Sequence, residues 1–124
     1  MELMIAVVIV AIIVAIAIPA YNKYILKSRR SEGLQTLMAI QLAEEKYRTT
    51  NSAYGDLATV WGGTTTENGY YTLATSNVTA SSYTITATAV GSQAGDRDGT
   101  TSCATLTLTY SNGTTTRTPI DCWD

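Results

Sequence analysis

The sequence predicts an α+β fold in which an N-terminal helical region packs on an antiparallel β-sheet. Three observations carry this prediction. An uninterrupted apolar run occupies Leu3–Ile18, a pattern with a helical period follows it to about residue 48, and apolar residues alternate with threonine from about residue 70. The length of 124 residues allows one compact head of ordinary size and leaves no room for a second.

Composition excludes most enzyme classes. The chain has no His and no Phe, and it has two Cys. Histidine-based acid–base catalysis, a Cys/His zinc site and a haem-attachment motif are therefore excluded, and no catalytic residue, metal or cofactor is expected. Residues 51–124 hold two Lys/Arg against six Asp/Glu. Because phosphate binding requires clustered cations, nucleic acid is a disfavoured partner for the head alone.

The first segment has the length of a membrane-spanning helix. The nineteen residues Leu3–Tyr21 carry no charge, and at 1.5 Å per residue they approach the roughly 30 Å thickness of the bilayer hydrocarbon. A secretory signal peptide places positive charge before a shorter apolar stretch and a cleavage site after it. Here Glu2 precedes the run, which continues directly into Tyr21-Asn22-Lys23-Tyr24. We expect the segment to be retained.

Two signals disagree about the side of the membrane on which the rest of the chain lies. The basic residues Lys23, Lys27, Arg29 and Arg30 follow the apolar run, and by the positive-inside rule they favour the cytoplasm. The two Cys and the Thr-rich second half favour an external location.

Glu2 and Pro19 are unusual for an ordinary membrane anchor. An unpaired carboxylate that enters hydrocarbon costs on the order of 2.5–3.5 kcal/mol, so Glu2 either has a partner or stays among the lipid headgroups near the positive helix N-terminus. Pro19 removes one backbone hydrogen bond inside the helical pattern, which predicts a kink or break.

The second helical stretch is amphipathic. Leu34, Leu37, Met38 and Leu42 fall on one face, which Gln41 interrupts, and this face is expected to cover the sheet. A narrower stripe of Ile40, Ala43 and Tyr47 lies well round the helix. It is either a solvent-exposed surface or, as we prefer, a contact to neighbouring helices. Helical signals end after residue 48, and a loop follows over residues 51–69.

From residue 70 the period changes to two. Alternation over 83–89 and again over 104–110 predicts two strands with one buried face each, and Tyr71 with Leu73 suggests a third. Turn residues occur at 67–69, 95–99 and 111–113, so the strands are expected to form an antiparallel meander on the helix. The acids in 95–99 alternate, but they lack the further ligands of a calcium loop and favour a plain turn. Pro119 is expected at a strand end or sheet edge.

Cys103 and Cys122 are expected to form a disulfide if the head lies outside the cytoplasm. Strict alternation places Cys103 on the threonine side of its strand. Either a bulge intervenes, or the bridge closes over the outer face.

The N-terminal sequence MELMIAVVIVAIIVAIAIPAYNKY resembles the first helix of type IV pilins. The resemblance comprises a glutamate ahead of an unbroken Val/Ile/Ala run and the Ile-Pro-Ala-Tyr that closes it. The C-terminal Asp121-Cys122-Trp123 is similar to the ending of small pilins, which include minor pilins and DNA-uptake pilins.

The resemblance implies a pilin fold with one helix to about residue 50, interrupted near Pro19. Residues 1–24 would be a membrane and filament-core helix, and 25–124 a globular head with an amphipathic helix (25–50), a loop (51–69) and a sheet with a disulfide-bonded C-terminal region (70–124). It implies a methylated residue ahead of the segment matching Met1, and it names an adjacent subunit's N-terminal amine as the assembly partner of Glu2. Ala11, where many pilins carry Gly, predicts only a short loosened segment near 14–19.

The implied function is that of a structural subunit in a type IV pilus-like surface filament used for adhesion, motility or DNA uptake. Its partners would be identical subunits, the inner membrane before assembly and the pilus assembly machinery, and its location the bacterial cell surface. One alternative is a low-abundance minor pilin that acts as a binding module, for example as a DNA-uptake receptor. Another is a plain membrane-anchored domain.

Overall fold

The computed structural model describes residues 1–123, which form a long helix and a head built on a four-stranded sheet. The helical segments of this part of the chain are α1 (Glu2–Arg48), α2 (Leu57–Val60) and the 3-10 turns η1 (Gly91–Gly95) and η2 (Ile120–Trp123). The strands are β1 (Tyr71–Ser76), β2 (Ser82–Ala89), β3 (Arg97–Asp98), β4 (Thr101–Ser102), β5 (Thr105–Ser111) and β6 (Thr114–Thr118). The predicted α+β class is confirmed.

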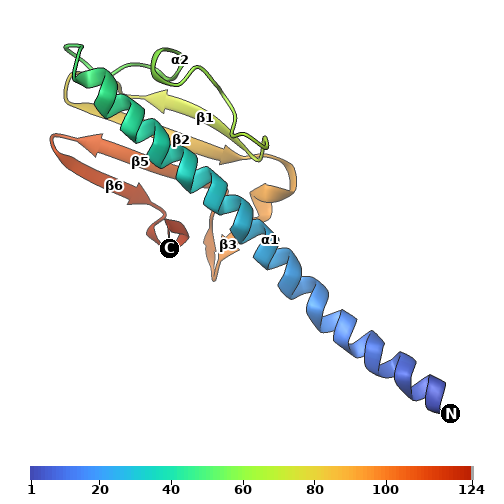
Figure 1. The fold of residues 1–124 in the computed structure, drawn as a ribbon. Coiled ribbons are helices and arrows are strands. Elements are labelled where there is room, and N and C mark those ends of the chain that lie inside the picture. Colours follow the sequence, from blue (N-terminus) through green and yellow to red (C-terminus); the bar gives the residue numbers. More distant parts are fainter. Residues whose placement is uncertain (124) are drawn as a thin grey trace.

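The sheet is an antiparallel meander with one short insertion. Its order is β1-β2-β5-β6, and the two-stranded β3–β4 hairpin is inserted between β2 and β5. The second half of α1 lies across one face of the sheet, while the first half projects beyond the head (Figure 1). The head is thus a two-layer structure of one helix on one sheet, and its core lies between them.

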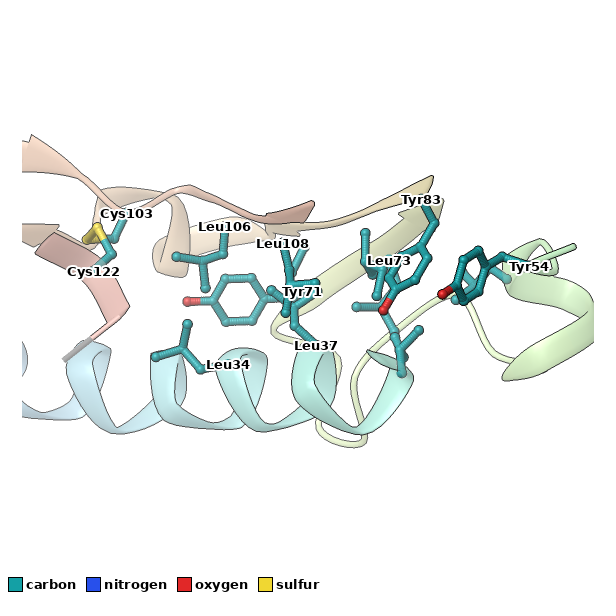
Figure 2. Packing of buried hydrophobic residues seen from close by; sticks show 14 residues of the cluster. Leu34, Leu37, Tyr54, Tyr71, Leu73, Tyr83, Cys103, Leu106, Leu108 and Cys122 are labelled. Atoms are coloured by element: carbon teal, nitrogen blue, oxygen red, sulfur yellow. A yellow bond between two sulfur atoms is a disulfide. The ribbon is translucent and has the colours of Figure 1, made fainter. Parts of the chain in front are cut away.

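The predicted strand alternation is confirmed in the core. Ile85 of β2 pairs with Leu108 of β5, and both side chains are fully buried. In Figure 2, Tyr71 of β1 lies between Leu106 of the sheet and Leu34 of α1. A Cβ atom at Gly33 would come within 3.0 Å of the Tyr71 ring, so glycine at this position allows the tyrosine to pack directly on the helix backbone.

The predicted buried face of the second helical stretch is partly wrong. Leu34 and Leu37 are buried as expected, but Met38 is 43% exposed and Leu42 is 72% exposed. Ile40, expected on an outer stripe, is fully buried. The face that meets the sheet also contains two charged residues, Arg30 and Glu44. A hydrophobicity pattern assigns charged residues to the exposed side of a helix. Because Arg30 and Glu44 are in fact buried, the predicted buried face of α1 was placed too far round the helix.

β6 was not predicted. All five of its residues are exposed and none is a large apolar residue, so the sequence carries no alternation there. The strand forms because the expected turn at 111–113 returns the chain, with Asn112 and Gly113 both at positive φ, and because β6 pairs with β5. Pro119 follows β6 directly, at the edge of the sheet as expected.

The structure joins Cys103 and Cys122 in a disulfide with an S–S distance of 2.05 Å, and both residues are fully buried. The bridge does not close over the outer face. Because β5 begins only at Thr105, its alternation does not extend back to Cys103, which turns toward the core side instead. The bond ties η2 to the start of β5.

We predict that the Cys103→Ser/Cys122→Ser variant is less stable than the parent chain by about 3 kcal/mol, the chain-entropy value for a loop of this size. The two cysteines are 19 residues apart, and the apolar core that they border is small. Denaturant unfolding followed by tryptophan fluorescence measures the loss. If reduction of the parent chain and the double substitution both left the unfolding midpoint unchanged, the bridge would contribute nothing to stability.

Candidate functional site

The apolar half of α1 is exposed along its whole length. All side chains of residues 1–24 are exposed, including those of Leu3, Ile9 and Ile18. Its most apolar 18-residue window has a mean hydropathy of 3.2 and no residue buried against the head, and the helix is long and apolar enough to cross a membrane. An apolar surface of this size requires a cover of lipid or of other helices.

Glu2 lies in the first turn of α1, at the far end of this apolar surface. No cation of residues 1–123 lies within ion-pair distance of its carboxylate. An ionic partner of Glu2 is therefore expected on another molecule. The role of Glu2 in assembly stays a prediction.

Pro19 does not interrupt the helix in the single chain. α1 continues through it from Glu2 to Arg48 without a break, so the interruption expected near Pro19 is absent here. Neighbouring residues keep their own backbone hydrogen bonds on both sides, which limits the effect of one missing donor. Unwinding of this segment in a filament is a separate prediction.

The four cations that follow the apolar run divide into two kinds. Arg30 is buried and forms an ion pair with Asp96, with Nε 2.6 Å from Oδ2 and Nη2 2.9 Å from Oδ1, and its Nη1 also donates to Asp98 at 3.2 Å. Hydrogen bonds to Asp96 raise the pKa of Arg30. Arg29 stacks over the Tyr70 ring at 4.4 Å from its centroid, and Lys23 and Lys27 are exposed.

The Arg30–Asp96 pair fixes the inserted segment to the helix. Gln93 of η1 adds a second link, because its Nε2 donates to the Leu26 carbonyl and to the Tyr71 hydroxyl, both at 2.9 Å. The sequence pattern alone places Arg30 in a basic group and predicts a plain turn at residues 95–99. The clue to the burial of Arg30 is its position, because it lies one turn before Leu34 on the buried face.

Glu44 is a second buried charge that sequence reasoning missed. Its Oε2 accepts a hydrogen bond of 3.0 Å from the Gly55 backbone N–H, while its Oε1 and the nearby core hydroxyl of Tyr83 are buried without partners. Burial raises the pKa of the Glu44 carboxyl above its ordinary value of 4.5, and Glu45 and Asp56 add to the shift. Burial raises the pKa of Tyr83 as well.

We predict that Glu44→Gln stabilises the head at neutral pH and has little effect near pH 4. The folded chain holds the Glu44 proton more tightly than the unfolded chain does, so this group's contribution to the free energy of unfolding falls as pH rises through the raised pKa. At about pH 7.5 we expect a gain of about 1 kcal/mol, because glutamine keeps the acceptor and removes the buried charge. Urea unfolding at both pH values, with Glu45→Gln as control, measures the difference. An equal effect at both values would contradict the prediction.

The other arginines of residues 1–123 lie apart from one another on the head. Arg117 lies on β6 over the Trp123 ring, with 5.5 Å to its centroid. Arg97 donates to the Thr100 carbonyl on the β3–β4 hairpin. Arg48 lies at the opposite end of the head, where it donates to the carbonyls of Asn51 and Ala80.

Comparison with known protein families identifies the family of this chain. A family model described as "Type IV minor pilin ComP, DNA uptake sequence receptor" matches residues 19–107, which is more than half of the chain. The matched region begins at Pro19 and includes the second half of α1 and strands β1 to β4 with part of β5. A search of curated proteins finds no match. On the extent of the family match, together with the long helix packed on an antiparallel sheet, the chain belongs to the ComP family of type IV minor pilins.

Proposed function

We propose that this chain is a subunit of a type IV pilus-like filament and that it polymerises through the apolar half of α1. The observation that carries the proposal is the complete exposure of that half, which projects from the head with Glu2 at its far end. Hydrophobic burial is the main driving force of association, so parallel packing of such helices in an axial core would be strongly favourable. The heads would then cover the outside of the filament.

The second half of α1 supports assembly over a plain membrane anchor. Met38 and Leu42 lie on α1 outside its buried face, where they are 43% and 72% exposed. Scattered apolar residues on a surface need no explanation, but these two continue the exposed apolar character of the first half of the helix. In the filament we expect them to contact helices of neighbouring subunits, the role assigned from sequence to the stripe of Ile40.

The proposal divides the chain at about residue 24. Residues 1–24 would anchor the subunit in the inner membrane before assembly and form the filament core afterwards, and residues 25–124 would form the head. The pilus assembly machinery would move the subunit between these states, and the product would lie at the bacterial cell surface. The proposed role is structural and not enzymatic.

The test is the composition of surface fibres. Cells expressing the full chain are sheared, and the fibres are collected and quantified by mass spectrometry. Recovery of the chain as an integral fibre component supports the proposal, and a high stoichiometry indicates the bulk subunit. Full retention of the chain in the membrane fraction, with fibres that lack it, would contradict the proposal.

We predict that the turn before Pro19 unwinds in the filament. A residue spans about 3.3 Å in extended chain against 1.5 Å in a helix, so a short extended gap lengthens the subunit where a packed core requires it. Because Ala11 lies where many pilins carry a helix-weakening glycine, we expect the gap to stay within residues 14–19. A map of the filament measures this directly. Continuous helical density over residues 3–30 would contradict it.

A second candidate function is that of a DNA-uptake receptor in low copy number, and the family match favours it. The charge of the head does not, because residues 51–124 contain only the cations Arg97 and Arg117 against six acids. A DNA site would have to combine these with cations of α1 or of a neighbouring subunit.

Salt dependence distinguishes the two candidate functions. If the chain in detergent binds duplex DNA through two or three phosphate contacts, log K falls with log salt at a slope of about 0.9 per contact. The variant Arg97→Gln/Arg117→Gln should then weaken binding and lower the slope. No binding even at low salt would exclude a receptor role for the single subunit and leave the filament role standing.

A further inference from the structure

A basic surface lies where the apolar half of α1 enters the head. We call it the neck surface and define it by Lys23, Tyr24, Lys27 and Arg97. Lys23 and Lys27 are one turn apart on α1, and together with Arg30 they line one wall of a cleft of about 450 Å³. The opposite wall is the segment Gly95–Gly99, which contains Arg97. The β3–β4 hairpin lies beside α1 at the end of the head from which the apolar half projects (Figure 1).

The acids of this cleft neutralise only part of the neck surface. Both carboxylates of the opposite wall, Asp96 and Asp98, are bound by the Arg30 guanidinium at 2.6 to 3.2 Å. Among residues 1–123, the ion pairs within 4.0 Å are those that Arg30 makes with these two acids. Arg30 carries one positive charge against these two carboxylates, so one negative charge remains beside Lys23, Lys27 and Arg97. With four cations against two acids, the exposed cleft keeps a net positive charge.

Aromatic residues complete the surface. Tyr24 is 72% exposed and lines a shallow groove with Lys27. Tyr21 is 64% exposed and lies further round α1, where it lines a groove with Arg29 and Tyr70. Tyrosine has an apolar ring and a polar hydroxyl, and it is enriched where hydrocarbon meets the lipid headgroups. Because Tyr21 and Tyr24 are not buried within the subunit, their rings and hydroxyls are free to contact a partner of this mixed character.

The position of the neck surface along the helix selects that partner. The charge-free run ends at Ala20–Tyr21, and about 30 Å of helix fills the hydrocarbon. At 1.5 Å per residue, Lys23 and Lys27 then lie within roughly 10 Å of the hydrocarbon boundary, which is the depth of the headgroup layer and the water beside it. The long lysine stems allow their ammonium groups to reach headgroup phosphates.

We propose that the neck surface binds anionic phospholipid headgroups and so holds the unassembled subunit in the membrane with the Gly95–Gly99 side of its head against the bilayer. The proposal rests on the proposed function, because it concerns the membrane stage before assembly. Duplex DNA has the same phosphate chemistry, but the bilayer itself covers this height of α1 before assembly. Lipid is therefore the partner that the position of the surface favours.

The test is a competition between two lipid compositions. The full chain in detergent is mixed with equal amounts of phosphatidylcholine nanodiscs and of nanodiscs containing about one-third phosphatidylglycerol, the detergent is removed, and the chain in each population is quantified. Each lysine near an anionic surface contributes roughly a fivefold preference. We expect the parent chain to favour the anionic discs and Lys23→Gln/Lys27→Gln to lower that preference about twenty-five-fold. The matched control, Lys46→Gln/Arg48→Gln at the distal end of α1, should behave as the parent.

The outcomes separate this proposal from the membrane stage on which it rests. Insertion into both kinds of disc with no anionic preference would overturn the lipid proposal and leave membrane anchoring intact. Insertion into neither would contradict the membrane stage itself. Equal lipid partitioning of parent and lysine variant, together with duplex binding that the lysine variant loses, would assign these cations to nucleic acid and overturn the proposal.

Discussion

Cells that express Glu2→Leu as their only copy are expected to form at least about tenfold fewer surface fibres than cells with the parent chain. Removal of one partner of a buried charge pair leaves the other charge uncompensated, which costs several kcal/mol. The head should fold normally, because Glu2 lies at the end of the exposed half of α1 and contacts no part of the head. The apolar run becomes one residue longer, so membrane insertion should be retained or improved. The variant should therefore accumulate in the membrane as a folded, disulfide-bonded monomer.

The physical reason is the fate of the carboxylate. In an axial core of packed helices Glu2 is in surroundings as poor in water as the bilayer, where a charge persists only with a partner or by neutralising itself. The resemblance to pilins names the N-terminal amine of an adjacent subunit as that partner. An incoming subunit would then gain both apolar packing and the removal of an unpaired charge from lipid, and its register on the filament would be set by the meeting of the two charges.

Glu2→Gln separates charge from shape, since it keeps the size and polarity of the side chain. We expect it to lower fibre yield nearly as much as Glu2→Leu does. Glu67→Gln, which removes an exposed acid of the head, is the matched control and should leave the yield unchanged. Normal fibre yield from Glu2→Leu in cells without a parent copy would show that hydrophobic packing alone assembles the filament and that Glu2 is a headgroup carboxylate.

Most of the fold was predictable because two simple periods determine it. Tyr83, Ile85 and Ala87 alternate with threonines, and the structure buries all three. The uninterrupted apolar run predicted a membrane-length helix, and the structure leaves that run exposed outside the head. These signals are local, and each can be read from a window of about ten residues.

The parts that could not be predicted depend on partners far away in the sequence. Arg30 and Glu44 are charged, yet they lie on the buried face of α1 because Asp96 and the Gly55 backbone N–H receive them. Arg30 and Asp96 are 66 residues apart, and no local pattern connects them. The same limit applies to β6, whose polar sequence becomes a strand only because β5 offers an unpaired edge.

The second large effect is expected at this buried ion pair. Arg30→Met should lower the free energy of unfolding by about 3–5 kcal/mol, the usual loss when one partner of a buried pair is removed and the other is left uncompensated. Asp96 has 2% of its surface exposed, so solvent cannot take the place of the guanidinium. The inserted segment with β3 and β4 would also lose its main attachment to α1. Denaturant unfolding of the full chain in detergent measures the loss, with tryptophan fluorescence as the probe because Trp61 and Trp123 both lie in the head.

Two single substitutions at more exposed charged residues near the ion pair serve as controls. Asp98→Asn removes the outer carboxylate, whose side chain is 39% exposed, and it should cost less than about 1 kcal/mol, as for surface ion pairs. Arg97→Gln changes an exposed cation beside the pair and should leave stability nearly unchanged. If Arg30→Met were no more destabilising than Asp98→Asn, the guanidinium would be sufficiently hydrated to act as a surface group.

The double variant Arg30→Met/Asp96→Leu tests what the pair contributes beyond stability. Desolvation offsets most of the attraction between buried charges, so replacement of both partners by apolar residues should restore most of the lost free energy. A cycle of the two single variants and the double variant isolates the coupling between the residues. If the double variant regains stability but no longer fixes the β3–β4 hairpin against α1, as judged by amide hydrogen exchange over residues 95–102, the pair acts in placing the hairpin. Arg97 would then lose its place in the neck surface, and the preference for anionic lipid should fall in a chain that is otherwise stably folded.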